Sequence, residues 1–206
     1  DELSVDQLKQ VGRLLARIHQ VGARRGAKQR LHLTPQTYGI DNLNTLIATG
    51  LLPPDFVGAL KTVVERLVER MTPDFESVRK QLVHGDCHLG NLLWSQQGPF
   101  FLDFDDSMIA PCMQDIWLIA PGRDTYAQEQ REILIDSYQM MRDFDRRELK
   151  LVEPLRALRR IYFATWIAKR WKDPAFPRAF PQFGTNEYWR ELYSDLEEIY
   201  EIMCGI

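Results

Sequence analysis

The sequence predicts a mostly helical α+β fold that contains one small β-hairpin. Apolar residues recur at helical spacing through most of the 206 residues, whereas one middle stretch shows short β-type runs separated by a turn. Hydrophobic residues make up 45% of the chain, which is enough to form a substantial core. We expect residues 1–206 to form one lobe, with a core segment at 81–117 and helical remainders at 1–80 and 118–206.

The first helix is the most clearly marked. Ser4-Val5-Asp6-Gln7 is a capping-box pattern, and apolar residues at helical spacing follow it to about Gly22. Pro174–Pro181 carries three prolines, so we expect a stiff extended connection there and no helix. The remaining helices are expected at about 42–49, 55–71, 113–120, 125–142, 145–171 and 187–203.

Three short strands are expected in the core segment. Gln81–Val83 is the first, and a loop at 84–91 follows it. Leu92–Trp94 and Phe100–Leu102 flank a turn that contains Gly and Pro, so they predict a hairpin. The loop and the ends of these strands carry most of the reactive residue types in the segment.

The loop reads His-Gly-Asp-Cys-His-Leu-Gly-Asn, with Asp86 five residues before Asn91, and Asp103 ends the last strand of the hairpin. Phosphoryl transfer uses a carboxylate that accepts the proton of the attacking hydroxyl, together with an amide and a second carboxylate that hold metal ions on the phosphates. The spacing therefore favours Asp86 as catalytic base and Asn91 and Asp103 as metal ligands. The alternatives are a turn-capping Asp, a turn Asn and a solvated acidic turn.

Other polar residues near this motif have two interpretations each. His88 is a candidate phosphate contact or a residue that braces the loop, and His84 is expected to support the loop backbone. Asp115 is expected to cap a helix or anchor the loop, while Asp105 adds charge beside Asp103 and has no assigned role. His19 is interpreted as a half-buried packing residue of the first helix.

Composition excludes several classes of protein. The net charge of −3 gives no reason to expect nucleic acid or a membrane surface as partner, and no apolar run approaches the ~20 residues of a membrane helix. Three cysteines, Cys87, Cys112 and Cys204, are widely spaced and lack a CxxC pattern, which is typical of a reducing cytoplasm. Cys87 is expected to be inert, because the neighbouring carboxylate disfavours its thiolate.

The loop His84–Asn91 resembles that of the aminoglycoside phosphotransferase/choline kinase-like family, which has the protein-kinase fold. The segment Leu102–Asp106 is similar to that family's metal-binding segment, although Asp105 stands where Gly is expected. Segments 14–19, 110–117, 153–159 and 170–177 resemble the bacterial stress-response kinase A branch. The resemblance implies the C-terminal lobe of a kinase, cytoplasmic, with Mg²⁺ and ATP as cofactors and Ser/Thr hydroxyls of proteins as acceptors.

Two departures from the family pattern lead to further expectations. The chain has no Gly-rich loop and no Lys–Glu pair before its first helix, so we expect that the N-terminal nucleotide lobe is absent and that the chain alone is nearly inactive. The apolar surface left by that lobe is expected to allow self-association. The stretch from Asp103 to Asp115 is short for an activation segment and offers only Ser107 as a hydroxyl. This also fits a small-molecule kinase acting on an aminoglycoside, choline or homoserine-like acceptor, and a non-catalytic partner-binding lobe is a third alternative.

Overall fold

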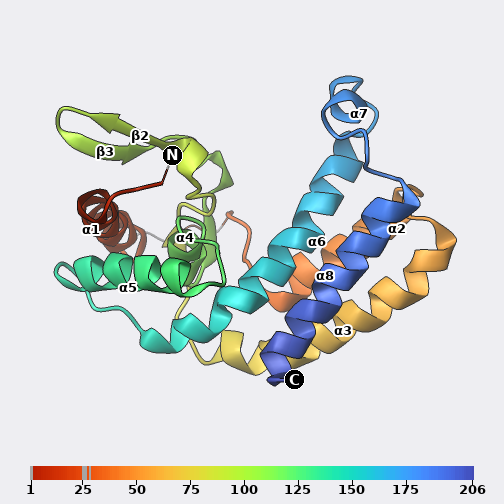
Figure 1. Ribbon diagram of the computed structural model, residues 1–206, viewed down its shortest axis with the longest axis horizontal. Coiled ribbons are helices and arrows are strands. Elements are labelled where there is room, and N and C mark those ends of the chain that lie inside the picture. The colour runs from red at the N-terminus through yellow and green to blue at the C-terminus, as the bar shows by residue number, and fades with distance from the viewer. Residues whose placement is uncertain (1, 25–26, 28) are drawn as a thin grey trace. The chain divides into compact units, whose positions relative to one another are not determined.

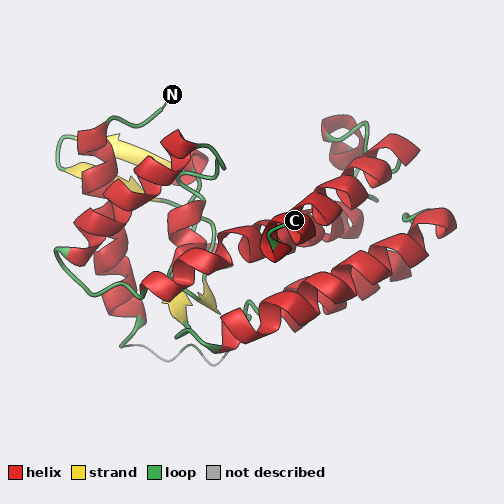
Figure 2. Ribbon diagram, turned by 60° about the horizontal axis from the view of Figure 1, so that its bottom comes forward, coloured by secondary structure: helices red, strands yellow, loops and turns green. Residues whose placement is uncertain are grey.

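The computed structural model describes residues 2–24, 27 and 29–206, and these form two compact units (Figure 1). The first, here called the motif unit, contains the residues up to Leu33 together with Ser77–Val152. The second, the helical unit, contains Thr34–Glu76 and Glu153–Ile206. Both are largely helical, as the sequence predicts, and Figure 2 shows the strands as short elements among the helices.

The motif unit combines helices with two two-stranded sheets. Short 3₁₀ turns cover 89–91, 104–106 and 146–151. The longer elements are α1 (Val5–Gly22), α4 (Met113–Trp117), α5 (Thr125–Gln139), β1 (Gln81–Val83), β2 (Leu92–Ser95), β3 (Gly98–Phe101) and β4 (Met108–Ala110).

The predicted hairpin and the predicted first strand are confirmed, but sequence analysis missed the partner of that strand. Strands β2 and β3 pair in antiparallel register with Leu93 opposite Phe100. Strand β1 pairs antiparallel with β4, and the backbone of Ile109 in β4 also bonds to Leu31 and Leu33 on its other side. The three residues of β4 are too few to show a period in the sequence, so only long-range pairing defines them.

Helix α1 forms where the capping box predicts it. Ser4 accepts the amide of Gln7, and the Gln7 side chain accepts the amide of Ser4 in return. The buried face of α1 packs against α5, which lies beside it in Figure 1. Gly12 lies at this contact, and a Cβ placed there would lie 2.4 Å from the carbonyl oxygen of Leu134. The two helices therefore approach closely because residue 12 has no side chain.

Replacement of Gly12 by Ala is expected to destabilise the protein by about 2 kcal/mol or more, because the backbone of α5 must move to admit the methyl group. Gly58 in α3 (Pro54–Glu76) is the matched control, since a Cβ there meets nothing within 4 Å. Gly58→Ala is expected to stabilise the protein by roughly 0.5–1 kcal/mol through helix propensity. Urea denaturation of both variants checks the pair, and equal effects of the two substitutions would contradict it.

The helical unit consists of helices around its own core. Helix α3 packs along α8, with Leu60 and Leu67 of α3 and Trp189 and Leu196 of α8 fully or almost fully buried. Arg66 of α3 also binds the carboxylate of Glu197. A π-helical turn covers 35–40, and the other elements are α2 (Asp41–Ala48), α3 (Pro54–Glu76), α6 (Val152–Arg170), α7 (Ala175–Ala179) and α8 (Asn186–Cys204).

The structure corrects one prediction for this unit and refines another. The stretch Pro174–Pro181 is not extended throughout, because residues 175–179 form helix α7. Pro177 is its third residue, and the first residues of a helix have amides without intrahelical acceptors, so the missing N–H of proline costs nothing there. Helix α3 runs through Pro73 to Glu76, where sequence analysis expects the helix to end at about residue 71.

Over the described residues, no helix combines the length and the apolar character that crossing a bilayer requires.

Candidate active site

Asp86 lies in the loop between β1 and the 3₁₀ turn at 89–91, with its side chain 21% exposed. Its Oδ2 atom lies 3.3 Å from Nδ2 of Asn91 and 3.3 Å from Nε2 of His88. Nδ1 of His88 accepts the amide of Gly90 at 3.0 Å, so Nε2 carries the proton in the neutral ring and faces Asp86. One donor, Nδ2 of Asn91, thus bonds to the carboxylate oxygen that Nε2 of His88 approaches.

Asn91 and Asp103 lie close together because the backbone amide of Leu102 donates to the carbonyl of Asn91 at 2.9 Å. The Nδ2 atom of Asn91 also donates to the carbonyl of Asp86 at 3.1 Å, so the amide nitrogen faces the loop. Asp103 has φ 61° and ψ 68°, and it is the one non-glycine residue with positive φ in the described part of the chain. Such backbone strain concentrates at functional positions and supports a role for its exposed carboxylate.

His84 connects the loop to the end of the hairpin and is completely buried. Its Nε2 donates to the carbonyl of Leu102 at 2.8 Å, and its Nδ1 accepts the amide of Asp86 at 3.3 Å. The ring also packs against Phe101 and Phe104, at centroid distances of 5.4 and 4.4 Å. With both ring nitrogens used, His84 supports the loop and leaves no atom free to react.

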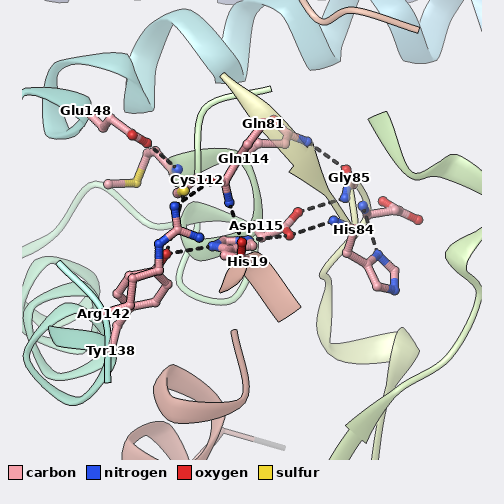
Figure 3. A network of polar contacts seen from close by, with 12 residues as sticks. His19, Gln81, His84, Gly85, Cys112, Gln114, Asp115, Tyr138, Arg142 and Glu148 are labelled. Carbon is pink, nitrogen blue, oxygen red and sulfur yellow. Dashed lines mark hydrogen bonds and ion pairs between the residues drawn. The ribbon is translucent and has the colours of Figure 1, made fainter. Parts of the chain in front are cut away.

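Asp115 holds the other side of the loop (Figure 3). Its Oδ2 accepts the amide of His84 at 2.9 Å, and its Oδ1 accepts the amide of Gly85 at 2.8 Å. Nε2 of His19 lies 2.9 Å from the same Oδ2, and Nδ1 of His19 lies 3.1 Å from the hydroxyl of Tyr138. This chain of contacts links the loop to α4, α1 and α5.

The electrostatics of this buried group favour an ion pair. Complete burial acts to lower the pKa of His19, but the electrostatic influence of Cys112 and the bond to Asp115 outweigh it and raise the pKa to about 10. Burial acts to raise the pKa of Asp115, yet hydrogen bonds from His19 and from the two loop amides hold it below its usual value. Both residues are therefore charged at neutral pH.

Sequence analysis interprets His19 as a half-buried packing residue, but its side chain is fully buried and paired with Asp115. The histidine continues the apolar stripe of α1 four residues after Leu15, which identifies a buried position. Its partner is 96 residues away in the sequence, so no local pattern could reveal the pair.

The remaining predicted residues have defined places. Asp105 lies in the exposed turn at 104–106, where its backbone carbonyl accepts from Arg30. The hydroxyl of Ser107 makes a local hydrogen bond, which it donates to the carbonyl of Phe104. Cys87 is buried, and burial followed by the nearby Asp115 raises the pKa of its thiol well above its usual value. This agrees with the expectation that the Cys87 thiol is inert.

Gly85 is required by the geometry of the loop. It has φ +92°, and a Cβ on it would lie 2.4 Å from the carbonyl oxygen of Asp106. Gly85→Ala is expected to cost about 2 kcal/mol or more and to lower the transfer rate, because the loop and the acidic turn must separate. Gly50→Ala is the control, since Gly50 has φ +72° and open space around it. It is expected to cost only about 1 kcal/mol in thermal or urea unfolding, and an equal cost at both sites would refute the argument.

A mostly helical fold with this loop and an adjoining acidic strand end defines a class of protein: a phosphotransferase of the kinase-like type. The comparison with protein families agrees, because the model described as the phosphotransferase enzyme family (APH) matches residues 1–152. The chain belongs to this family.

Among curated proteins, the chain is 36% identical to stress response kinase A of Escherichia coli strain K12 over 190 residues, which cover 90% of this chain and 57% of that protein. It is also 36% identical to a protein named serine/threonine protein kinase RdoA of Salmonella typhimurium over 191 residues, with coverage of 91% and 57%. The chain thus spans little more than half the length of these relatives.

Solved structures share the fold at low sequence identity. An amicoumacin kinase in complex with AMP-PNP, Ca²⁺ and Ami superposes with a TM-score of 0.67 at 18% identity, over 97% of this chain and 60% of that one. A spectinomycin phosphotransferase in complex with ADP and spectinomycin gives a TM-score of 0.61 at 16% identity, over 100% and 68%. Both are kinase-type enzymes, which agrees with the predicted fold class.

Proposed function

We propose that this chain is the catalytic region of a kinase that transfers the γ-phosphate of ATP to Ser/Thr hydroxyls of proteins in a bacterial stress response, in the cytoplasm. The observation that carries the proposal is the loop, in which Nδ2 of Asn91 donates to Oδ2 of Asp86 and Nε2 of His88 lies 3.3 Å from the same oxygen. The name of one relative at 36% identity, serine/threonine protein kinase RdoA, supports a protein acceptor, and the name of the other, stress response kinase A, supports a role in a stress response.

In the proposed reaction, Asp86 takes the proton of the acceptor hydroxyl as the acceptor oxygen bonds to the γ-phosphorus. The bond between that phosphorus and the β–γ bridging oxygen breaks, and ADP leaves. His88 has its N–H beside Asp86, and we assign this donor to the transferring phosphate, which requires the ring to turn from Oδ2.

The oxygen of the Asn91 side chain and the carboxylate of Asp103 fit Mg²⁺, a cation that prefers hard oxygen ligands and is commonly bound by one or two carboxylates plus substrate phosphates. Nδ2 of Asn91 is already bonded to Asp86, which leaves its Oδ1 for the cation. When bound, Mg²⁺ neutralises the charge of the phosphates during transfer.

An apolar surface on the hairpin adjoins these two ligands. Leu93 and Phe100 are cross-strand partners, and Leu102 lies two residues beyond Phe100; the three side chains are 42%, 40% and 45% exposed. We propose that the base of ATP packs here, because an apolar face beside the proposed metal ligands suits a nucleotide whose phosphates point at the metal.

The same surface is the site at which we expect the isolated chain to self-associate. Sedimentation of a concentrated sample that shows only monomer would count against this expectation.

Small-molecule phosphorylation is the second candidate, favoured by the short span between Asp103 and Asp115. Strand β4 occupies the middle of this span and pairs with β1, which leaves little free chain for docking a peptide. The solved structures with this fold include kinases named for small molecules, which keeps this candidate open.

The test uses the full-length protein with Mg-ATP, a protein acceptor and a panel of small hydroxylated acceptors, with Asp86→Asn as the inactive control. Phosphoserine or phosphothreonine that disappears in the control supports a protein kinase. ATP consumption only with small acceptors supports the second candidate. If neither kind of acceptor is phosphorylated in a way that depends on Asp86, both candidates are contradicted and a partner-binding lobe is favoured. The 206-residue chain assayed alongside is expected to show little or no transfer.

A further inference from the structure

A cavity lies in the motif unit, and nothing in the proposed reaction uses it. Its volume is about 420 Å³, which is within the range of small-molecule sites. Its lining residues come from β1 and the segments at 79, 112 and 142–148, and none belongs to the loop 84–91 or the acidic turn 103–106. Figure 3 shows Arg142, Cys112 and Glu148 on one side of Asp115, with His84 and Gly85 on the other.

Two arginines of this cavity lack an anionic partner. Over the described residues, neither Arg79 nor Arg142 forms an ion pair with a carboxylate. Arg142 donates from Nη2 to the side-chain oxygen of Gln81, while its Nη1 is enclosed and has no hydrogen-bond partner. A buried donor without an acceptor is rare in folded proteins and marks a position that is incomplete without another group.

The acidic residues of the lining do not neutralise these arginines. The carboxylate of Asp145 is paired with Arg147 at 2.7 Å, and Glu148 accepts the backbone amide of Met113 at 2.8 Å. Burial raises the pKa of Glu148 to about 7, despite the amide bonds that act to lower it, so its negative charge is reduced at neutral pH. Among the described residues, Asp143 is the one lining carboxylate without an ion pair or a hydrogen bond, beside the guanidinium groups of two lining arginines.

Gln81 connects the cavity to the buried ion pair. Its side chain is almost completely buried, and its Nε2 donates to the backbone carbonyl of His19 at 3.1 Å. Because the Gln81 oxygen is the acceptor of Arg142, a ligand that draws the guanidinium toward the cavity competes with this bond. The cavity therefore adjoins the contacts that hold the catalytic loop.

We propose that this cavity is a second binding site, separate from the catalytic loop, for a small molecule that carries a phosphate or carboxylate group held by Arg79 and Arg142. Guanidinium groups bind both kinds of oxyanion through paired N–H donors, so the shared chemistry is a planar or tetrahedral oxyanion of small size. The site goes beyond the proposed kinase function and does not depend on it.

The test is calorimetric titration of the full-length protein with inorganic phosphate and, separately, with malonate, at constant ionic strength in chloride. AMP-PNP and Mg²⁺ are present so that the catalytic loop already faces phosphates. We expect saturable binding that weakens about tenfold or more in Arg79→Gln and in Arg142→Gln. Arg79 is exposed and makes no polar contact within the described residues, so its substitution leaves folding intact. Arg146→Gln is the matched control, because Arg146 pairs with Glu132 outside the cavity.

Each outcome decides the proposal. Binding that is lost in both cavity variants and kept in Arg146→Gln supports it, and the tighter of the two probes assigns phosphate or carboxylate as the preferred group. Absence of saturable binding with either probe overturns it. Binding that is unchanged in Arg79→Gln and Arg142→Gln also overturns it, because the anion then lies elsewhere.

Discussion

Asp86→Asn is expected to lower the rate of phosphoryl transfer by about 10²–10⁴-fold, since the amide cannot accept the proton of the acceptor hydroxyl. The substitution keeps the shape of the side chain, and its oxygen can still accept from Asn91. The affinity for nucleotide and the free energy of unfolding are therefore expected to stay close to those of the wild type. Turnover at saturating acceptor, nucleotide binding and urea denaturation measure the three quantities.

Asp136→Asn provides the control for this prediction. Asp136 is an exposed carboxylate on α5, outside the loop and the acidic turn, so its neutralisation should leave the rate within about twofold of wild type. A rate of Asp86→Asn close to wild type would remove Asp86 from its proposed role. Equal losses in both variants would point to an effect of net charge and not to a catalytic base.

Asp115→Ala is expected to destabilise the protein by about 3–5 kcal/mol, because it leaves the charge of His19 buried without a partner. The amides of His84 and Gly85 lose their acceptor at the same time. The double variant His19→Gln/Asp115→Asn should lose less free energy of unfolding than the sum of the losses in His19→Gln and Asp115→Asn, since the pair is lost once. Urea denaturation of the wild type, these two single variants and the double variant gives the coupling energy. Strict additivity would show that the two residues do not act as a pair.

The same pair predicts a dependence of stability on pH. The folded-state pKa of His19 is about 10, above the value near 6.5 of an unfolded chain, so its contribution is complete below about pH 6.5 and is lost as pH rises toward 10. The lowered pKa of Asp115 has the opposite sign, and its contribution is lost in acid below about pH 4. His19→Gln should therefore lose less stability than wild type between pH 6.5 and 10. Parallel curves for the two proteins would contradict the charged state of His19.

The candidate site could be predicted from the sequence where its residues are close along the chain. Asp86, Asn91 and the strand that ends at Asp103 fall within one short segment, so their spacing indicates both structure and chemistry. The support of that segment could not be predicted, because it depends on contacts between α1, α4 and α5. A histidine at a buried helix position has no local signal that distinguishes packing from an ion pair.

Short elements show the same limit in the fold. Strand β4 exists because β1 on one side and the backbone of Leu31 and Leu33 on the other complete its hydrogen bonds, and three residues carry no period of their own. Helix α7 was excluded by its prolines, although proline is tolerated in a first turn. The long helices α1, α3 and α8 were found at nearly their observed positions, since many apolar residues at helical spacing define each of them.

The attachment of the loop 84–91 to a buried carboxylate has a consequence for engineering. Because Asp115 accepts the amides of His84 and Gly85 and also pairs with His19 in α1, we expect the loop to open only when the core of the motif unit does. Heat inactivation should therefore coincide with melting of the motif unit and not precede it. Substitutions that stabilise the packing of α1 against α5 should therefore raise the melting temperature. Substitutions on the exposed face of the loop should lower the turnover rate and leave the melting temperature unchanged.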